Sequence, residues 1–501
     1  MKPEDNIKFG SISGHALIRT VGIVCMLVGA ILLFPLITLF PFPEEISEAR
    51  YFIIPGVSCM GIGYCLALNI GGKKKERQNG YKGFFVLLTW IFMILGSSIP
   101  FILTGKYSFT QAVFECTSGY TTTGLSVVDV TETSHMFLFF RSEMLFVGAA
   151  GLILIVASVM SDKKGMKLYE SQEHSNKSPA HILQTAKVVV LIYTGYIAAG
   201  MILYKIFGMN WFDALNHSIA AVSTGGFSTR PESIGYYNNL GIEVVTIVLM
   251  LAGSVNFFLH LSLLRGKWKN IYTDCEIRFS LFIYPFATVV ITALLAEGFS
   301  MSIPEGIRIG IFQSVSAMTT TGLRTLDSFQ DWNSALLFVM ILLMIIGGSA
   351  ASMSGGIKQY RVWIQIKEVY WNIKASMHNK RVVFARKITR CGREIEVDHR
   401  FYRESHSFIT AYLFLLMAGT FVFTCYGYSL EDSLFEMASS LSTVGFSTGI
   451  IGYDAPSAIL WVSTLGMFLG RLEIFVVFIT IGKLIGHINR RVRKGVRKWK
   501  R

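Results

Sequence analysis

The sequence predicts an all-α integral membrane protein of about ten spans. Two N-terminal helices precede four repeated helix–pore-loop–helix units, related by pseudo-fourfold symmetry around one pore. Three observations predict this fold class. Hydrophobic residues make up 52% of the 501 residues and charged residues only 16%, with a mean hydropathy of +0.50. Ten apolar runs reach the ~20 residues that a helix needs to cross a bilayer. One short Thr-x-Gly string recurs four times between these runs.

The composition excludes several classes of protein. A soluble domain usually carries about a quarter of its residues charged, and a disordered chain has far fewer apolar residues than this one. The net charge of +14 comes from basic residues that lie between apolar runs, which indicates membrane orientation rather than nucleic-acid binding. The seven cysteines are scattered without a CxxC pair, so we expect small buried side chains. No small-residue cleavage site follows the first apolar run, so we expect no removable signal peptide.

The ten predicted spans lie near 16–41, 51–70, 83–104, 137–160, 186–207, 241–264, 276–299, 335–357, 407–428 and 457–482. An even number of spans places both termini on the same side, and loops rich in Lys and Arg mark the cytoplasmic side. We therefore expect a multi-pass protein of the cytoplasmic (inner) membrane with cytoplasmic N- and C-termini. The residues that indicate this orientation are Lys73, Lys74, Lys75 and Arg77; Lys163, Lys164 and Lys167; Arg265, Lys267 and Lys269; and the tail residues Arg490, Arg491, Arg493, Lys494, Arg497 and Lys498.

The cytoplasmic loop 361–404 is the longest connection. Its stretch 382–397 alternates in polarity, which predicts a small β-hairpin that turns at Cys391-Gly392. The alternative is a flexible linker.

Four predicted outward-facing connections contain a related string. The strings are Tyr120-Thr-Thr-Thr-Gly-Leu-Ser126, Val222-Ser-Thr-Gly-Gly-Phe-Ser228, Met318-Thr-Thr-Thr-Gly-Leu-Arg324 and Leu441-Ser-Thr-Val-Gly-Phe-Ser447, which align on Gly124, Gly226, Gly322 and Gly445. Upstream columns match as well, with Phe114-Glu115, Asn216-His217, Phe312-Gln313 and Phe435-Glu436 in equivalent places. A lone Thr-x-Gly is an ordinary turn, but four copies in register between the same flanking spans predict a repeated unit.

About ten residues of mixed polarity precede each string, too short a stretch to span the membrane. The repeating unit is therefore a span, a short re-entrant helix, a Thr-x-Gly loop and a second span. The predicted organisation is an N-terminal two-helix unit at 1–80, pore repeats at 81–162, 186–268, 276–360 and 405–482, a cytoplasmic loop at 361–404 and a basic cytoplasmic tail at 483–501.

The chemistry of such loops points to a monovalent cation. Non-helical backbone at membrane depth persists only where it is buried in protein or lines a water-filled cavity. Rings of backbone carbonyls on one axis can replace the hydration shell of an ion, and glycine permits the backbone angles that this requires. Thr443-Val444-Gly445 reproduces the start of the potassium-channel filter motif.

With these four loops the chain resembles the Trk/Ktr/HKT superfamily of potassium transporters, and in particular its TrkH-type members, over nearly its whole length. The resemblance implies potassium uptake through one pore, with K+ as the transported ion and no organic cofactor. It implies that carbonyls of the two residues before each filter glycine hold the ion: Thr122 and Thr123, Thr224 and Gly225, Thr320 and Thr321, and Thr443 and Val444. In plant relatives a serine at the first filter position accompanies sodium preference, so Gly124 implies potassium.

The resemblance also implies partners. Family members form homodimers and are gated by a cytosolic ring of NAD- or ATP-binding regulatory subunits (TrkA-like). This sequence has no GxGxxG or P-loop, so nucleotide control would come from such a partner. The loop 361–404 and the tail are the candidate docking surfaces, the surrounding partner is membrane lipid, and no nucleic-acid partner is expected.

The eighth span ends in a glycine- and serine-rich stretch that weakens a helix. We expect a broken helix whose middle forms an intramembrane gating loop, as the resemblance implies; the alternative is close helix packing through small residues. Arg471 lies deep in the tenth span and cannot snorkel, so we expect it to contact this loop and the permeation path. The alternative is an ion pair with another span. The predicted gate residues are Gly347, Gly348, Ser352, Ser354, Gly355, Gly356 and Arg471.

Four other polar residues receive their own interpretation. Arg324 would repel incoming cations at the outer mouth, with Asp327 near enough in sequence to pair with it. Arg141 and Glu143 lie near an outer helix end and are interpreted as interfacial, and a packed or interfacial role is expected for His260.

Two rival functions remain. One is a sodium-selective or non-selective cation pathway. The other is an intramembrane enzyme, which would need paired carboxylates, HExxH or a Ser/His arrangement at membrane depth, and the sequence contains none. We therefore expect no enzymatic activity.

Overall fold

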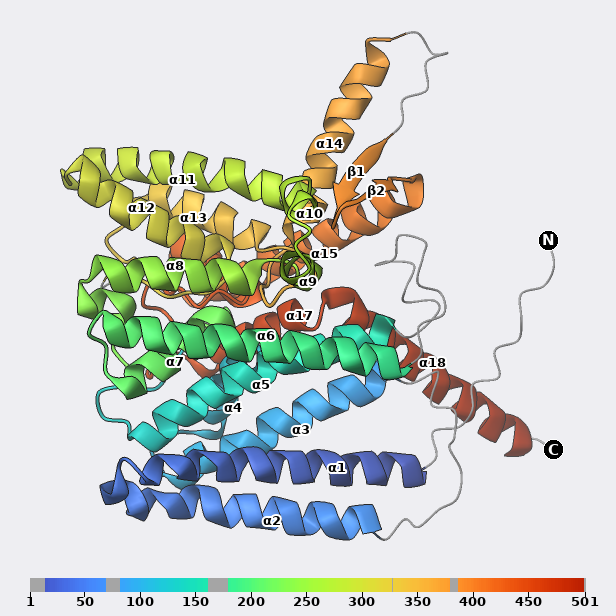
Figure 1. Cartoon of the computed structure of the whole chain (residues 1–501). Helices are drawn as coiled ribbons and strands as arrows, with labels where there is room; N and C mark the ends of the chain where they lie inside the picture. Colours follow the sequence, from blue (N-terminus) through green and yellow to red (C-terminus); the bar gives the residue numbers. More distant parts are fainter. Residues whose placement is uncertain (1–13, 69–81, 161–178, 327, 379–385, 500–501) are drawn as a thin grey trace. The chain divides into compact units, whose positions relative to one another are not determined.

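The computed structural model describes residues 14–68, 82–160, 179–326, 328–378 and 386–499 (Figure 1). The chain divides into two compact units, one formed by Met1–Ala112 with Glu473–Arg501 and the other by Val113–Leu472. The lysine-rich loops at 73–77 and 163–167, which helped to predict the orientation, lie outside the described residues.

The first unit contains α1 (Gly14–Leu33), α2 (Ala49–Leu68), α3 (Lys82–Leu103) and α18 (Ile474–Trp499), with the short 3-10 helices η1 (Phe34–Leu39) and η2 (Pro43–Glu48) between α1 and α2. Helices α1 and α2 lie side by side (Figure 1). Their backbones approach closely at Gly22, where an added Cβ would lie only 2.9 Å from the Gly63 carbonyl oxygen. Small residues at such contacts are typical of helix association in membranes.

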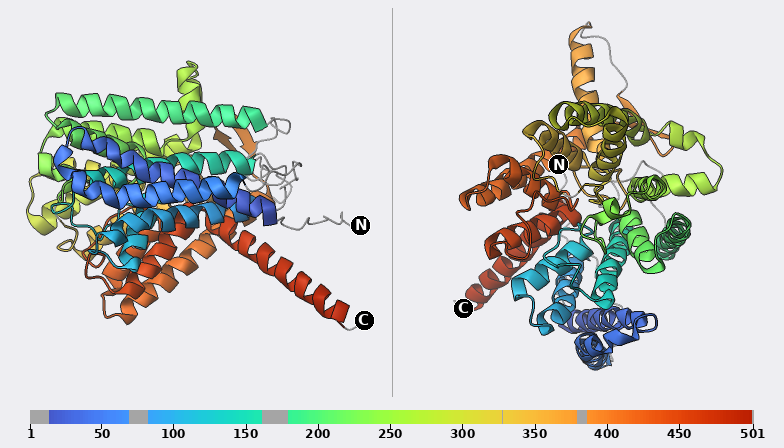
Figure 2. Two further views of the ribbon diagram at one scale, coloured as in Figure 1. Left: turned by 90° about the horizontal axis from the view of Figure 1, so that it is seen from below. Right: turned by 90° about the vertical axis from the view of Figure 1, so that its left-hand side faces the viewer.

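The second unit contains most of the first repeat, the second and third repeats, and the fourth repeat up to Leu472 (Figure 2). Its longer helices are α5 (His135–Met160), α6 (Pro179–Ile206), α8 (Leu240–Ser254), α11 (Cys275–Phe299), α13 (Ser334–Ile346), α14 (Gln359–Ser376), α15 (His399–Cys425) and α17 (Ser457–Arg471). Shorter elements are η4 (Ser233–Tyr237), α9 (Phe257–Leu264) and α10 (Lys269–Tyr272). Helices α11 and α12 (Ile303–Met318) lie side by side in Figure 1.

A short helix precedes each Thr-x-Gly string, as the repeat predicts. These short helices are α4 (Phe109–Tyr120), α7 (Trp211–Val222), α12 (Ile303–Met318) and α16 (Leu430–Leu441). Capping side chains begin three of them: Ser108 accepts the N–H of Gln111 at 3.3 Å, Asn210 accepts that of Asp213 at 2.7 Å, and Ser429 accepts that of Asp432 at 3.1 Å. Such caps satisfy backbone donors that have no partner within the helix.

Each of the ten predicted spans corresponds to a helix or to a pair of helices in the described residues. Six helices are long and apolar enough to cross a membrane, and the number rises to eight if each of two bent pairs is one span. The prediction of unbroken helices at 241–264 and 457–482 is wrong. The first of these runs bends by 106° between α8 and α9, and the second breaks between Arg471 and Ile474.

Local chemistry explains both breaks. After Ser254 the Asn256 side chain accepts the N–H of Phe258 at 3.0 Å, so it caps a new helix rather than continuing the old one. In the tenth run, Glu473 adopts a left-handed φ of 61°, which a regular helix does not contain. The eighth run ends as a helix at Ile346, as its glycine pairs predict.

The predicted hairpin is confirmed. Strand β1 (Lys387–Arg390) pairs antiparallel with β2 (Arg393–Glu396), so two short strands add to the otherwise helical fold. Cys391 and Gly392 form the turn with φ values of 48° and 76°, as a two-residue type I′ turn requires. Hereafter "the hairpin" means residues 387–396.

Candidate functional site

The four short helices end in the same way. In the first repeat the N–H of Thr122 donates to the Gly119 oxygen at 3.0 Å, and the N–H of Thr123 donates to the Ser118 oxygen at 2.9 Å. This bond pair defines a Schellman ending, and it recurs at Thr224-Gly225, Thr320-Thr321 and Thr443-Val444. These bonds use carbonyls of the last helical turn and none from the string residues 122–123, 224–225, 320–321 and 443–444. Among the string carbonyls, that of Gly225 accepts the N–H of Phe227 at 2.7 Å.

A threonine occupies the position where this ending usually has glycine. The φ values are 53° at Thr122, 51° at Thr224, 55° at Thr320 and 55° at Thr443. A left-handed conformation costs a residue with a Cβ about 1–2 kcal/mol. A left-handed threonine at the same place in all four strings indicates that the string requires both this backbone conformation and the threonine side chain.

The four aligned glycines form a closed ring. A Cβ on Gly124 would lie 2.8 Å from the Gly225 oxygen, and one on Gly226 would lie 2.6 Å from the Thr321 oxygen. In the same sense Gly322 abuts the Val444 carbonyl, and Gly445 abuts the Thr123 carbonyl. Each glycine therefore faces the next repeat, and the fourth repeat closes onto the first.

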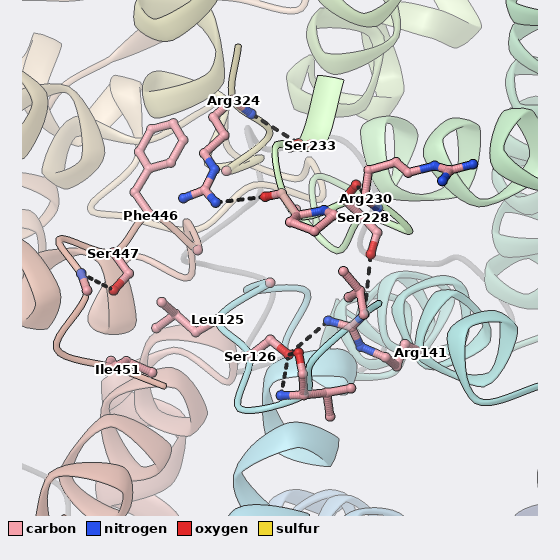
Figure 3. Close-up of a pocket in the computed structure, with 18 of the residues that line it drawn as sticks. Leu125, Ser126, Arg141, Ser228, Arg230, Ser233, Arg324, Phe446, Ser447 and Ile451 are labelled. Atoms are coloured by element: carbon pink, nitrogen blue, oxygen red, sulfur yellow. Dashed lines mark hydrogen bonds between the residues drawn. The ribbon is translucent and has the colours of Figure 1, made fainter. Parts of the chain in front are cut away.

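One cavity of about 440 Å³ opens on this ring. All four glycines line it, together with residues that follow them in the chain, including Leu125, Ser126 and Phe446 (Figure 3). The structure thus brings together the four predicted filter glycines and the residues that directly precede them, Thr123, Gly225, Thr321 and Val444. The threonines that precede the glycines do not line the cavity and are fully buried.

Three threonine hydroxyls point to a missing partner. Oγ1 of Thr122, Thr224 and Thr443 is buried and has no hydrogen-bond partner among the described residues. A buried hydroxyl without a partner is costly, so natural proteins rarely leave one unsatisfied. Oxygen atoms are the ligands of hard cations, so these hydroxyls and the nearby carbonyls fit an ion or its water.

A column of polar residues on the short helices braces the loops from outside the ring. Glu115 accepts from Oγ of Ser126 at 3.0 Å, and Glu436 accepts from Oγ of Ser447 at 2.5 Å. At the equivalent places His217 Nε2 lies 2.9 Å from Ser228 Oγ, and Gln313 Nε2 donates to Thr325 Oγ1 at 3.3 Å. From the sequence this column was used only as a sign of the repeat, although in three repeats it lies 11 residues before the loop serine.

The interfacial interpretation of Arg141 and Glu143 is wrong. Arg141 is 2% exposed and its Nε lies 2.8 Å from a carboxylate oxygen of Glu115. Its guanidinium also donates to Ser126 Oγ at 3.0 Å (Figure 3). It lies 4.1 Å from the ring centre of Phe227. Arg141 therefore ties the loops of the first two repeats together, and Glu143 is likewise buried.

Two further arginines line the cavity, and each has a partner. Arg230 pairs with Asp213 at 2.9 Å. Arg324 donates to the Pro231 carbonyl at 2.8 Å (Figure 3). Asp327, the predicted partner of Arg324, lies outside the described residues.

After α13 the chain forms a closed loop, residues 347–358, which we call the intramembrane loop. Its ends meet because Lys358 N–H donates to the Ile346 oxygen at 3.0 Å. Gly347 and Gly356 face each other with φ values of 71° and 74°, and a Cβ on either would lie within 2.9 Å of the other's Cα. The glycine pairs therefore allow the chain to reverse its direction. Non-helical backbone within a membrane persists only where protein surrounds it or where it lines a cavity.

The bend between α8 and α9 supports the loop. The carbonyls of Gly253 and Ser254, at the end of α8, accept the N–H groups of Met353 at 3.2 Å and Ser349 at 3.1 Å. The Phe257 N–H, at the start of α9, donates to the Ala351 oxygen at 3.0 Å. The broken span thus supplies the partners that the loop's own backbone lacks.

The intramembrane loop contacts the Thr-x-Gly ring on the side of the threonines, away from the cavity. The Gly355 N–H donates to Thr320 Oγ1 at 2.7 Å. A Cβ on Gly355 would collide with the Ser442 carbonyl and with Thr443 Oγ1. The loop therefore touches the third and fourth strings at once.

Arg471 lies against the same loop. It is 3% exposed, and its Nη1 donates to the Met353 carbonyl oxygen. Its Nε and Nη2 have no hydrogen-bond partner among the described residues. Within the loop, Ser352 Oγ donates to the Ser349 oxygen at 2.6 Å, whereas Ser354 Oγ is buried without a bond to another described residue. The structure thus gathers all seven predicted gate residues.

His260 is a packed residue, as expected. It is buried, its Nδ1 lies 2.9 Å from the Tyr196 hydroxyl, and its Nε2 lies 2.9 Å from the Ala252 oxygen.

Comparisons with known proteins agree on one family. Residues 72–487 match the family model TrkH, described as a cation transport protein. The Trk system potassium uptake protein TrkH of Escherichia coli (strain K12) is 28% identical over 93% of this chain and 98% of its own, and that of Halomonas elongata is 27% identical over 92% and 97%. The crystal structure of the potassium transporter TrkH from Vibrio parahaemolyticus superposes with a TM-score of 0.81 at 26% identity, covering 93% of this chain and 98% of that one.

Proposed function

The chain belongs to the TrkH family of cation transport proteins, and we propose that the cation it carries is potassium. It is a multi-pass membrane protein and a transporter rather than an enzyme. The proposal is uptake of K+ through a single-chain pore with a carbonyl-lined filter. The single observation that carries it is the closed ring in which each string's glycine meets a carbonyl of the next repeat.

The ring supports dehydration of a monovalent cation. Four strings contribute carbonyls of the residues before Gly124, Gly226, Gly322 and Gly445, and an uncharged oxygen cage suits an ion of low charge. The three unpartnered threonine hydroxyls add oxygens at the inner end. The ion-holding groups in this proposal are the carbonyls of Thr122, Thr123, Thr224, Gly225, Thr320, Thr321, Thr443 and Val444.

Selectivity in this proposal depends on the absence of side chains at the ring. Because glycine occupies all four ring positions, no side chain of these four residues lies between the neighbouring carbonyls and the axis. The curated relatives in Escherichia coli and Halomonas elongata are named potassium uptake proteins, which supports potassium over sodium.

The intramembrane loop is the gate in this proposal. It presses on the threonine side of the ring through Gly355, and Arg471 holds its Met353 carbonyl. Gating in this proposal is a displacement of the loop away from the threonine side of the ring.

The proposal extends to assembly and orientation. Relatives are named as parts of a Trk system, which supports a membrane subunit that acts with others. We include a homodimer, a cytosolic nucleotide-binding regulatory ring docked at 361–404 and the tail, and cytoplasmic termini. Dependence of flux on added nucleotide in the presence of such a ring, and its absence without the ring, would test the regulatory part.

Flux in liposomes tests the function. Purified protein in vesicles loaded with K+ should show uptake of 86Rb+ above that of protein-free vesicles, with Na+ a poor competitor. Equal competition by Na+ would instead favour a sodium-selective or non-selective cation pathway. No flux above protein-free vesicles, either from wild type or from a variant with Arg471 replaced by alanine, would reject the proposal.

A further inference from the structure

A buried carboxylate at the start of α11 touches the intramembrane loop. Glu276 is fully buried, and its Oε1 accepts the Ala350 N–H at 2.7 Å. Its Oε2 has no hydrogen bond among the described residues but lies 3.8 Å from Nε of Arg390. Arg390 belongs to the hairpin, and its side chain is 10% exposed. One carboxylate therefore links the loop to the hairpin.

A second acidic residue fixes the hairpin to the same helix. Asp274 is buried, and its Oδ1 caps α11 by accepting the N–H of Glu276 at 2.9 Å. Its Oδ2 accepts the Cys391 N–H at 2.7 Å. The turn fits closely there, because a Cβ on Gly392 would collide with the side chain of Asn270. The helix start and the hairpin turn are thus held as one piece.

The hairpin and the loop also share an apolar core. Ile388 of β1 and Ala350 of the loop are 5% and 0% exposed and belong to one cluster with Cys275 and Tyr360. The hairpin, by contrast, is paired only through its own two strands in the described residues. An isolated two-stranded hairpin is marginally stable, so its seating depends on these contacts.

The energetics make Arg390 necessary. A buried carboxylate is strongly destabilising unless a cation or several hydrogen bonds compensate it. If the hairpin left its seat, Glu276 would keep one hydrogen bond and the smaller electrostatic influence of Lys358, but it would lose Arg390. The carboxylate would then turn toward water or take up a proton, and its bond to Ala350 would weaken.

We propose that Glu276 is a positioning residue for the intramembrane loop and that Arg390 holds it in place, so that the seating of the hairpin sets how firmly the loop is held against the filter. This inference rests on the proposed gating role of that loop. Through this link, a displacement of the hairpin within the segment 361–404 would loosen the intramembrane loop.

Four variants test the linkage in the full chain, reconstituted in liposomes. Glu276→Gln keeps an acceptor for Ala350 but removes the charge, and Arg390→Gln removes the cation. Each should raise basal 86Rb+ flux by about three- to tenfold and increase deuterium uptake in the peptide covering 347–356. The double variant should exceed the larger single effect by little, because both changes break the same link. Arg390→Lys should restore most of the wild-type behaviour.

The controls separate the two hypotheses. Lys387→Gln removes an exposed pair with Glu394 in the same hairpin and should leave flux and exchange unchanged. Arg471→Ala removes a contact of the loop and leaves the link between Glu276 and Arg390 intact, so it tests the loop independently of the hairpin. If Arg471→Ala raises flux while Glu276→Gln and Arg390→Gln behave like Lys387→Gln in both readouts, the linkage is wrong and the gate stands. If none of the variants, Arg471→Ala included, changes the flux of an active wild type, the proposed gate itself is wrong.

Discussion

The backbone N–H of Gly355 donates a 2.7 Å hydrogen bond to Oγ1 of Thr320, which joins the intramembrane loop to the third Thr-x-Gly string. At the three equivalent threonines this hydroxyl has no partner among the described residues. At this threonine position the third repeat therefore differs from the other three, and the difference lies where the loop contacts the ring. A pore of four equal subunits could not have this asymmetry; a single chain can.

Removing that bond should loosen the loop. Thr320→Val keeps the β-branched shape but leaves the Gly355 N–H buried without an acceptor, a loss of about 1–3 kcal/mol. We expect basal 86Rb+ flux to rise about fivefold or more. Thr224→Val is the matched control, since its hydroxyl bonds no described residue. A similar rise in both variants would mean that the effect comes from the filter and not from the loop.

A side chain in the ring should reduce selectivity. In Gly124→Ser the new Cβ would lie 2.8 Å from the Gly225 oxygen, and the backbone is at a φ of 95°. We expect the K+ over Na+ preference to fall about tenfold, since 1.4 kcal/mol of distortion suffices for that change. Gly427→Ser is the control, because Gly427 has a φ of 90° and open space around it. An unchanged preference in Gly124→Ser would contradict the filter assignment.

The buried pair of Arg141 and Glu115 should stabilise the outer part of the pore. Arg141→Gln leaves the Glu115 carboxylate, which is fully buried, without its cation. Breaking such a pair costs about 3–5 kcal/mol. Thermal unfolding in detergent should therefore shift clearly to lower temperature, whereas Lys387→Gln, at an exposed pair, should shift it little. Equal shifts in the two variants would show that the pair contributes no more than a surface pair.

The Cys391 thiol should report on the seating of the hairpin. Burial raises the pKa of Cys391 to about 12. The reactive thiolate is then a minor species at pH 8, and its fraction rises about tenfold per pH unit up to the pKa. Alkylation of Cys391 by iodoacetamide, followed by mass spectrometry, should keep rising to pH 10 in the folded protein. In the denatured chain it should level off near pH 9. A plateau near pH 9 in the folded protein would contradict the seating of the partly buried Cys391 against α11.

Several features could be predicted from the sequence because they depend on residues close together in the chain. Apolar runs locate the spans, the Thr-x-Gly strings locate the ends of the short helices, and Cys391-Gly392 locates the hairpin turn. The errors have a common origin. Arg141 was interpreted from its depth along its own helix, but its position is explained by Glu115, which belongs to a different helix. The bend at Val255–Asn256 pairs with a loop about a hundred residues later, so the apolar run alone could not reveal it.

The sequence by itself determined the positions of the apolar runs, the fourfold repeat and the residues at each turn, because hydropathy, helix endings and glycine angles are local properties. Only the tertiary structure decided which groups meet. The order in which the four glycines close their ring, the choice of Thr320 as the anchor of Gly355, and the link from Arg390 through Glu276 to Ala350 all join segments far apart in the chain. Such contacts depend on packing and on the need to compensate buried charges and donors, and no local pattern encodes them.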